Sequence, residues 1–338
     1  MSVGLDIGSN TIKVVELSKE GKGWRLKASG VVGYQGKAPE YAKEDKEMVP
    51  VVEAIKKLYK EAKISSKDIA IALPEAQVYT RTVKFPLLTD AEVASAVRWE
   101  AEQYIPIPVT EAIVQHSIIE RRESATPAEV LVLLVAAPKS LVEKYAKAVD
   151  MAGLNLIVVE TELMALVRSL APQDQTVLIV DFGAKATDIA VARNGFLTFS
   201  RSIPTAGEAF TRAVAQSLGV EEKQAEEYKR AYGMSQSQLE GKIKTALEPV
   251  FRTVADEMKK AIHFYQSEEK GDTPRSAILS GGSAGMPEVA SVLAKMLGIE
   301  VVVGNPFSKI TVDPAAVKSL AGFAQLYSIA SGLALREI

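Results

Sequence analysis

The sequence contains no cysteine, so disulfide frameworks and thiolate metal sites are excluded. Its only two histidines, His116 and His263, stand far apart and lack the carboxylate spacing of a metal site. No apolar run is long enough to cross a bilayer, and the first residues have strand character rather than that of a secretory signal. The 40 basic and 42 acidic residues include no basic block, which argues against nucleic-acid binding. We therefore expect a cytoplasmic protein without direct membrane insertion.

Apolar residues make up 47% of the 338 positions, enough to bury large cores in two or more lobes. The chain opens with predicted strands at Val3 to Ile7 and Thr11 to Leu17, and a third runs from Trp24 to Tyr34. The same order of strand, glycine turn and strand begins again at Thr176 to Phe182 and Thr187 to Arg193. The sequence thus predicts two similar halves.

A segment of different character separates these halves. A strand from Val78 to Phe85 leads to a helix start at Thr89, which can form a capping box with Glu92. Two strands and a helix follow, up to Met151. The predicted division is a first-lobe core at 1–76 with 158–175 and 315–338, an inserted subdomain at 77–157, a second-lobe core at 176–205 with 268–314, and a helical part of that lobe at 206–267.

Two predictions concern individual helices. The helix that starts at Thr89 is expected to bury Val97 and Tyr104 on one face and to end before Pro106. Near the end of the chain, a single helix rich in small residues is predicted from Leu320 to Leu335. Both predictions rest on the spacing of apolar residues.

Asp6 and Asp181 occupy matching places in the two halves. Each lies near the end of a buried strand, two residues before a glycine, Gly8 or Gly183. Glycine lets backbone N–H groups approach an anion closely, and successive N–H groups form an anion-binding nest. The carboxylate can hold Mg²⁺ through water, because this ion keeps much of its hydration shell. We expect the two turns to face each other and to bind a polyphosphate from both sides.

A third glycine turn, within Ile278 to Gly285, follows a short strand and offers a flat backbone surface for an adenine or a ribose. Each of the three motifs alone also fits an ordinary structural turn. Their occurrence together, in this order, predicts a nucleotide site.

These motifs resemble those of a known superfamily. Asp6-Ile7-Gly8-Ser9 with Lys13, Asp181-Phe182-Gly183 with Thr187-Asp188, and Ser280-Gly281-Gly282-Ser283 resemble the two phosphate motifs and the adenosine motif of the actin-like ATPases. Ala225-Glu226, Lys229 and Gly233 resemble a nucleoside-binding helix of bacterial actins such as FtsA. The run from Val97 to Pro108, with its Trp-Glu-Ala-Glu-Gln-Tyr-Ile-Pro core, is similar to the signature of the PilM family of type IV pilus assembly proteins.

The resemblance covers nearly the whole chain and implies an α/β fold. This is the two-lobed actin-like (ribonuclease H-like) ATPase fold with an inserted small α+β subdomain of the FtsA type. It also implies ATP and Mg²⁺ as ligands, with Asp6 and Asp181 holding the metal through water and Lys13 near the β- and γ-phosphates.

Other roles follow from the same resemblance. The phosphates would be contacted by Gly8, Ser9, Asn10 and Thr11 from one side and by Gly183, Ala184 and Lys185 from the other. The nucleoside would be surrounded by Glu208, Glu226, Lys229, Gly281, Gly282 and Ser283. Glu162 occupies the place of the catalytic, water-positioning acid of some bacterial actins. A solvated glutamate at a helix start would explain Glu162 as well, and charges on an exposed helix face would explain Glu226 and Lys229.

The second phosphate turn departs from the superfamily pattern. It reads Ala184-Lys185-Ala186, whereas superfamily members often have Gly-Gly or Gly-Thr there. A Cβ atom restricts close approach, and phosphoryl transfer depends on accurate placement of the attacking group. We expect ATP binding with slow or no hydrolysis, so that ATP acts as a conformational clamp.

The run from Arg98 to Pro108 also presents apolar surface. Trp99 and the Ile-Pro-Ile-Pro stretch, bordered by charged residues, suit contact with an extended peptide. In PilM-like proteins, the cleft beside the inserted subdomain takes the short N-terminal cytoplasmic tail of the inner-membrane protein PilN. The resemblance therefore implies a PilN-like partner, recruitment to the inner face of the cytoplasmic membrane, and contact with the pilus assembly platform and motor. Self-association stays open.

Two alternatives remain at this stage. The first is an FtsA-like polymerising cell-division protein, although such chains finish with a linker and an amphipathic membrane helix, whereas this sequence ends at Ile338 soon after a helix of core character. The second is a small-molecule kinase of the same architecture, which is expected to carry a catalytic aspartate between the lobes. A convincing candidate for that aspartate was not identified in the sequence.

Overall fold

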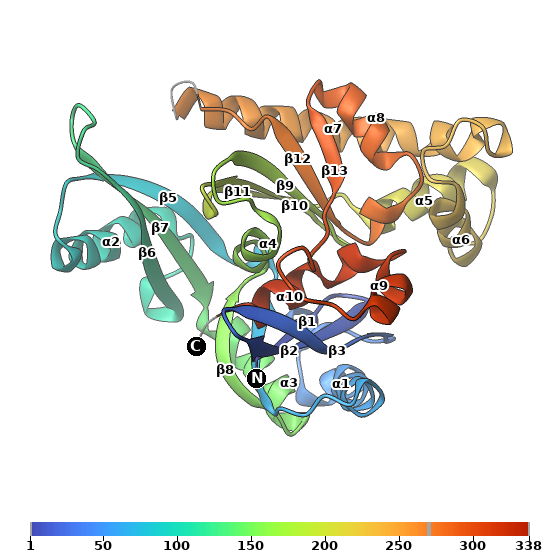
Figure 1. Ribbon diagram of the computed structural model, residues 1–338, viewed down its shortest axis with the longest axis horizontal. Coiled ribbons are helices and arrows are strands. Elements are labelled where there is room, and N and C mark those ends of the chain that lie inside the picture. The colour runs from blue at the N-terminus through green and yellow to red at the C-terminus, as the bar shows by residue number, and fades with distance from the viewer. Residues whose placement is uncertain (1, 269–271, 337–338) are drawn as a thin grey trace.

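Two five-stranded sheets with the same strand order form the centres of two lobes (Figure 1). The computed structural model describes residues 2–268 and 272–336. The first sheet has the order β3-β2-β1-β4-β8 and the second the order β11-β10-β9-β12-β13. In each sheet, a meander of three antiparallel strands is extended by two parallel strands. The two predicted halves are thus confirmed as repeats of one topology.

The strand boundaries agree closely with the apolar patterns. The first sheet comprises β1 (Ser2–Ile7), β2 (Thr11–Glu20), β3 (Gly23–Gly33), β4 (Asp68–Leu73) and β8 (Asn155–Thr161). The second comprises β9 (Thr176–Phe182), β10 (Thr187–Arg193), β11 (Phe196–Ile203), β12 (Ser276–Gly281) and β13 (Glu300–Val303). β8 was not predicted, because the expected domain boundary at Ile157 cut through it.

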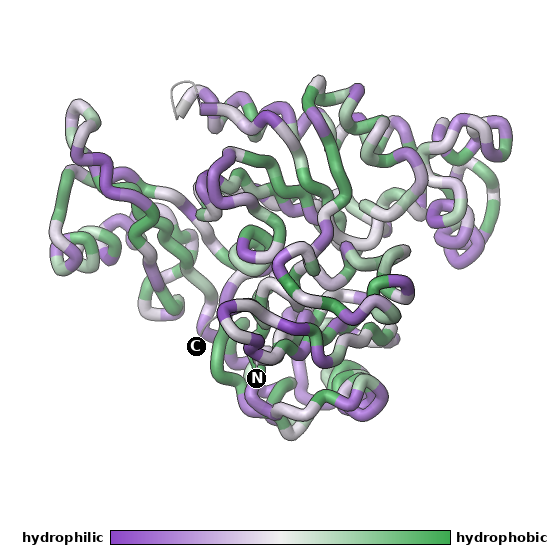
Figure 2. Tube along the Cα trace, viewed as in Figure 1, coloured by the Kyte–Doolittle hydropathy of each residue, from purple (hydrophilic) through white to green (hydrophobic). Residues whose placement is uncertain are grey.

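Helices cover both sheets, as the doubly buried central strands require. They are α1 (Val49–Ala62), α3 (Lys139–Met151), α4 (Glu162–Leu170), α5 (Gly207–Leu218), α6 (Glu222–Tyr232), α7 (Lys242–Glu268), α8 (Val289–Leu297), α9 (Pro314–Leu320) and α10 (Ser328–Ala334). Short 3₁₀ turns connect them at Pro39–Tyr41, Asp45–Met48, Glu75–Gln77, Val109–Glu111, Leu239–Gly241, Gly282–Gly285 and Ala324–Tyr327. Hydrophobic residues concentrate along β9 and β12, whereas hydrophobic and hydrophilic residues alternate along the outer helix α7 (Figure 2). Within 2–268 and 272–336, no helix combines the length and apolar character needed to span a bilayer.

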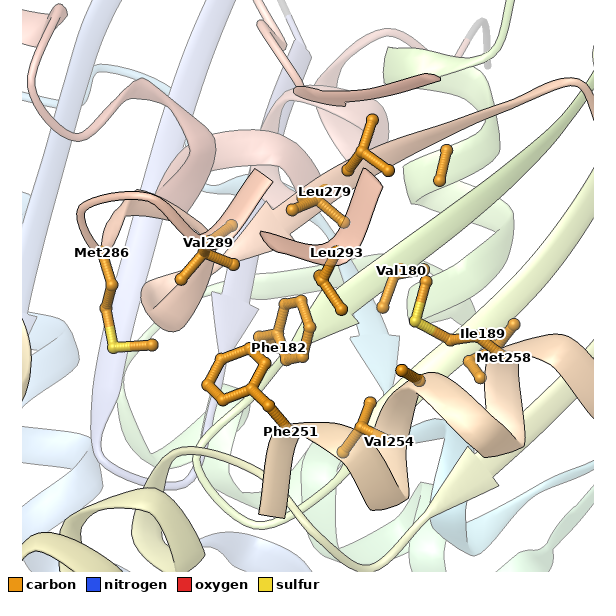
Figure 3. Close-up of a cluster of buried hydrophobic side chains, with 14 of the residues drawn as sticks. Val180, Phe182, Ile189, Phe251, Val254, Met258, Leu279, Met286, Val289 and Leu293 are labelled. Atoms are coloured by element: carbon orange, nitrogen blue, oxygen red, sulfur yellow. The ribbon is translucent and has the colours of Figure 1, made fainter. Parts of the chain in front are cut away.

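The core of the second lobe fixes the end of β9. Phe182, the last residue of this strand, is fully buried with Phe210 of α5 and Phe251 of α7. Figure 3 shows Phe182 beside Phe251. The ring centroids of Phe210 and Phe251 lie 4.4 Å apart, and that of Phe182 lies 5.9 Å from Phe251. Such packed aromatic groups hold the backbone that carries Asp181 and the following turn.

Small residues allow β1, α10 and α4 to approach one another closely. A Cβ atom at Gly332 of α10 would lie 1.9 Å from the carbonyl oxygen of Ala165 in α4. One at Gly4 of β1 would lie 2.1 Å from the carbonyl oxygen of Ala330. α10 is therefore wedged between the first sheet and α4. The prediction of one helix from Leu320 to Leu335 is wrong, because the chain leaves helical geometry at Phe323, with φ −150° and ψ 20°.

The inserted subdomain stands to one side of the lobes (Figure 1). It comprises β5 (Tyr79–Pro86), α2 (Asp90–Tyr104), β6 (Ala112–Arg122) and β7 (Glu129–Pro138), with the sheet order β5-β7-β6. The capping box between Thr89 and Glu92 is confirmed. The predicted range 77–157 also contains α3 and the start of β8, which pack in the core of the first lobe. The predicted boundaries of the inserted subdomain remain a prediction.

Tyr104 does not belong to the buried face of α2. Val93, Val97 and Ala101 form that face at four-residue spacing, and the next position in the series is Ile105, which is 7% exposed. Tyr104 is 42% exposed, and the Arg81 guanidinium lies 3.6 Å from its ring centroid. The prediction of a core role for Tyr104 is therefore wrong.

Candidate functional site

The two Asp-x-Gly turns have the same backbone geometry. The Gly8 N–H donates to the Thr11 carbonyl oxygen at 3.1 Å, and the Gly183 N–H donates to the Ala186 carbonyl oxygen at 3.0 Å. A Cβ atom would lie 3.1 Å from the Thr11 oxygen in the first turn and 2.8 Å from the Ala186 oxygen in the second. A Cβ atom at Gly183 would force the backbone to shift, and one at Gly8 would require the facing carbonyl group to move by a few tenths of an ångström.

Carboxylates from both lobes meet beside these turns. Asp6 is 2% exposed and forms an ion pair with Lys13, whose Nζ lies 3.1 Å from Asp6 Oδ2. Burial, together with the charge of Asp6, raises the pKa of Asp181 to about 6, although the Ser280 hydroxyl and the Lys13 ammonium oppose this rise. The electrostatic influence of Asp6 and Lys13 on Asp181 indicates that β1, β2 and β9 bring their charges together.

Three further acidic side chains extend this group. Burial raises the pKa of Glu162 well above its ordinary value, and the charges of Asp188, Asp6 and Asp181 raise it further. Burial also raises the pKa of Asp188 to about 8 and that of Glu75 above its usual range. Glu162 Oε2 accepts a hydrogen bond from the backbone N–H of Glu75 at 3.2 Å. Glu162 is thus a half-buried member of an acidic group, not a solvated glutamate.

The start of α5 is fastened to the second phosphate turn. The Gly207 N–H donates to the Gly183 carbonyl oxygen at 3.1 Å, and the Glu208 N–H donates to that of Ala184 at 2.8 Å. Asn10 of the first turn donates through Nδ2 to Glu208 Oε1 at 3.4 Å. This contact connects the two lobes directly.

Lys229 is buried, with 4% of its surface exposed. Its Nζ donates to the Gly207 carbonyl oxygen at 3.0 Å and to Thr211 Oγ1 at 2.9 Å, and it lies 2.5 Å from Glu226 Oε2. Burial lowers its pKa, and the Glu226 carboxylate counteracts this effect. The alternative of an ordinary exposed charge is wrong for Lys229, which instead fastens α6 to the start of α5.

The third glycine turn lies against the second phosphate turn. Gly281 has φ +83°, and a Cβ atom there would lie 2.4 Å from the Phe182 carbonyl oxygen. Ser280 lies directly opposite Asp181 in the sheet. Ser283 is 5% exposed, and its Oγ would lie 3.5 Å from a Cβ atom at Gly207. Three sequence-distant segments therefore converge on the start of α5.

The structure brings most of the predicted residues into one connected region. Contacts and charges connect Asp6, Gly8, Asn10, Thr11, Lys13 and Glu162 of the first lobe with Asp181, Gly183, Ala184, Glu208, Glu226, Lys229, Gly281 and Ser283 of the second. Ser9 and Gly282 lie next to these residues in the sequence. The Lys185 side chain is an exception, because it contacts an aromatic ring. Its Nζ lies 3.9 Å from the ring centroid of Tyr41. This cation–π contact joins the second phosphate turn to the 3₁₀ turn Pro39–Tyr41 of the first lobe.

Sequence reasoning missed several residues of this region. Asp188 lies at the register position that Lys13 occupies in the first half, and that symmetry was the available signal. Gly207 and Tyr34, whose hydroxyl donates to the Gly8 carbonyl oxygen at 2.9 Å, lack such a signal. Glu75 follows Pro74 at the end of a buried strand. No signal in the sequence indicates its role, because the groups around its carboxyl group come from distant segments.

The residues present fit a magnesium nucleotide. Across 2–268 and 272–336, no three or more His, Asp or Glu side chains are arranged to hold a metal by themselves. Mg²⁺ does not need such a set, since it is commonly held by one or two carboxylates, phosphate oxygens and water. Asp6 and Asp181 supply the carboxylates. The residues of the two glycine turns beside them are exposed or half-buried and therefore accessible to a ligand. Backbone N–H groups of this kind favour phosphate binding.

Comparison with known proteins extends these observations. A family model described as type IV pilus assembly protein PilM matches residues 4–338. The solved PilM-PilN type IV pilus biogenesis complex contains a chain similar to this one, with 28% identity, a TM-score of 0.84, and coverage of 99% of this chain and 98% of that chain. The ethanolamine utilization protein EutJ from Carboxydothermus hydrogenoformans has the same fold, with 17% identity, a TM-score of 0.61, and coverage of 99% and 89%. The predicted actin-like, two-lobed fold is thereby confirmed.

A curated relative is the cell division protein FtsA of Bacillus subtilis (strain 168). It is 24% identical over 247 residues, which are 61% of this chain. The matched region spans 54% of that relative's own length.

Proposed function

Because the chain belongs to the family of the type IV pilus assembly protein PilM, we propose that it is an ATP-binding, actin-like scaffold and switch of type IV pilus assembly at the inner membrane. The observation that supports nucleotide binding best is the meeting of Asp6, Lys13 and Asp181 beside two glycine turns of equal geometry. One turn and one acid come from each lobe, so a ligand held between them would hold the lobes together.

Specific residues would hold the ligand. Backbone N–H groups of the turns at Gly8 to Thr11 and Gly183 to Lys185 would bind the phosphates, and Lys13 would neutralise part of their charge. Asp6 and Asp181 would hold Mg²⁺ through water, and the region of Glu208, Glu226, Lys229 and Gly281 to Ser283 would take the nucleoside. Bound Mg²⁺ would compensate the negative charge of the triphosphate.

Slow or absent hydrolysis is part of the proposal. Glu162 is the candidate for positioning water, but burial and three neighbouring carboxylates raise its pKa well above the ordinary value, which disfavours its charged form. A protonated carboxyl group is a poor general base, and Ala184 and Ala186 add Cβ atoms to the turn. Closure of the lobes, rather than turnover, is therefore the proposed output.

The inserted subdomain is the proposed partner site. A pocket of about 300 Å³ lies where it meets the second lobe, and Glu75, Tyr79, Arg81, Tyr104, Leu134 and Ser200 contribute to its walls. Trp99, on the outer face of α2, is 66% exposed. We propose that these surfaces bind the N-terminal cytoplasmic tail of a PilN-like inner-membrane protein, because the similar chain of known structure was solved as a PilM-PilN complex. Through that partner, a cytoplasmic chain would be recruited to the membrane.

Two measurements on the purified chain test this function. Capture of a synthetic PilN-like tail should respond to MgATP, and phosphate release should stay below one turnover per second. Sustained release of many phosphates per second would rule out a clamp. ADP formation that depends on a sugar or a short acid, without an equal release of phosphate, would identify a kinase. ATP-dependent sedimentation would favour an FtsA-like polymer, the alternative that similarity to FtsA suggests.

A further inference from the structure

We propose that Glu75 couples the nucleotide site to the inserted subdomain: its backbone holds Glu162 and its side chain forms part of the partner pocket, so that filling one site changes the affinity of the other. This inference rests on the proposed function. It names the residue through which the two sites would communicate.

Glu75 lies at the point where the three parts of the molecule meet. It opens the 3₁₀ turn Glu75–Gln77, which connects β4 of the first lobe to β5 of the inserted subdomain. Its carboxyl group is surrounded by the hydroxyl groups of Thr161 at the end of β8, Thr80 of β5 and Ser200 of β11. One side chain therefore contacts the first lobe, the inserted subdomain and the second lobe.

The nucleotide side of this junction is a backbone contact. The Glu75 N–H donates to Glu162 Oε2 at 3.2 Å, and Glu162 in turn responds to the charges of Asp6 and Asp181. A change of charge beside Asp6 and Asp181 would change the electrostatic force on the Glu162 carboxyl group, since the interior screens charges weakly. The hydrogen bond then transmits this change to the turn that carries Glu75.

The partner side of the junction is the pocket wall. Glu75 is 5% exposed, and its Oε2 makes no hydrogen bond of good geometry within the described residues, nor does Thr80 Oγ1. Buried polar atoms without partners are rare and costly. Both residues line the pocket, but these two atoms are shielded from solvent, so a peptide in the pocket would reach them only if the turn that carries Glu75 moves.

The inserted subdomain is also fastened to the second lobe at this place. Thr82 Oγ1 donates to the Thr198 carbonyl oxygen at 2.6 Å, and Ser200 Oγ donates to that of Thr80 at 3.5 Å. Rotation of the second lobe on nucleotide binding would displace β11 relative to β5. Because Glu75 lies against both strands, such a displacement changes the pocket.

The test measures reciprocal binding. The affinity for MgATP is determined by titration calorimetry with and without a saturating synthetic peptide of the cytoplasmic N-terminal residues of the PilN-like protein from the same organism. In the wild-type chain, the peptide should change the ATP dissociation constant by about fivefold or more, a usual size for coupling between sites. In Glu75→Leu, which keeps the volume but removes the polar group, the two affinities should become independent. Glu75→Gln, which retains hydrogen bonding, should keep the coupling.

Control variants separate coupling from folding. Gln77→Leu changes an exposed residue of the same 3₁₀ turn and should leave the coupling unchanged. If Glu75→Leu does not fold, Thr80→Val supplies the second test, because it removes the hydroxyl group beside the Glu75 carboxyl group at little change of volume, and the coupling should fall by about half or more. Full coupling in Glu75→Leu or in Thr80→Val, or no coupling in the wild type when both ligands bind, would overturn the inference alone. Absence of ATP or peptide binding in the wild type would overturn the proposed function as well.

Discussion

Lys13 and Asp188 occupy the same register position in the two sheets. Each lies directly opposite the acidic residue of its turn motif, Lys13 opposite Asp6 and Asp188 opposite Asp181. The first half therefore presents an ion pair and the second half two acids, within one repeated topology. This difference leaves Asp188 buried beside like charges, with a raised pKa.

The buried acids predict a decline of stability with rising pH. Asp188 has a pKa of about 8 in the folded chain, against an ordinary value of 3.8, so the folded state retains a proton that the unfolded state loses. Between about pH 4 and 8, this group lowers the unfolding free energy by at most about 1.4 kcal/mol for each unit that the pH rises. Asp181 and Glu75, whose pKa values are also raised, act in the same direction.

Urea denaturation without nucleotide measures this slope. Asp188→Asn should reduce the slope and increase stability at the upper end of the range, since the amide needs no proton. Asp150→Asn, at an exposed position of α3, should keep the wild-type slope. An identical slope in Asp188→Asn would show that Asp188 is charged in the folded chain.

Lys229→Met should reduce both stability and nucleotide affinity. The change removes the buried ammonium group that donates to the Gly207 carbonyl oxygen and to Thr211 and that pairs with the Glu226 carboxylate, which costs about 1–3 kcal/mol of unfolding free energy. Affinity for ATP and ADP should fall by the same factor, because the residue belongs to the nucleoside side of the proposed site. Lys223→Met, at an exposed position of the same helix, is the matched control. Equal affinities in Lys229→Met and wild type would remove α6 from the site.

Trp99→Ala should weaken capture of the partner tail without affecting ATP affinity. The side chain is 66% exposed, so its removal changes little of the folded core. Exposed tryptophans that contribute to an interface commonly account for about 2 kcal/mol or more of binding, or roughly thirtyfold in affinity. Fluorescence anisotropy with a labelled tail peptide measures the change. Phe196→Ala, at a 50% exposed position in the second lobe, should bind like the wild type, and normal capture by Trp99→Ala would exclude this face of α2.

Gly332→Ala should separate α10 from α4. The added Cβ atom would lie 1.9 Å from the Ala165 carbonyl oxygen, a contact that neither backbone can relieve without moving. We expect a loss of about 3 kcal/mol or more of unfolding free energy, at the upper end of overpacking effects. Thermal unfolding followed by circular dichroism measures it. Gly322→Ala, which faces open space, should unfold like the wild type. A stable Gly332→Ala protein would contradict the tight contact between α10 and α4.

Local patterns predicted the repeated strands and the three glycine turns. Alternating or continuous apolar runs specified β1, β2, β9 and β10, and the Thr89 capping box specified the start of α2. The same reasoning failed at Tyr104. The helix ends at this residue, and the next residue, Ile105, occupies the buried position instead. It also failed at Leu320 to Leu335. The small residues there allow α10 to pack closely against its neighbours, and they do not form one continuous helix.

The candidate site was predictable only where a short motif carries it. Asp6, Gly8, Asp181 and Gly183 stand at fixed spacing along the chain, so the sequence reveals them. The burial of Lys229 depends on α5, and the surroundings of Glu75 come from β5, β8 and β11. Such environments arise from tertiary packing and leave no local pattern.

The central claim is that two glycine turns, one from each lobe, bind the phosphates of a single ATP molecule. Titration calorimetry of MgATP with the wild type, Asp181→Ala, Gly8→Val and the exposed control Gly23→Val tests it most directly. We predict binding to the wild type and to Gly23→Val, and a loss of about hundredfold or more in each of the other two variants, which corresponds to about 2.7 kcal/mol. Wild-type affinity in both Asp181→Ala and Gly8→Val, with each protein folded, would contradict the claim.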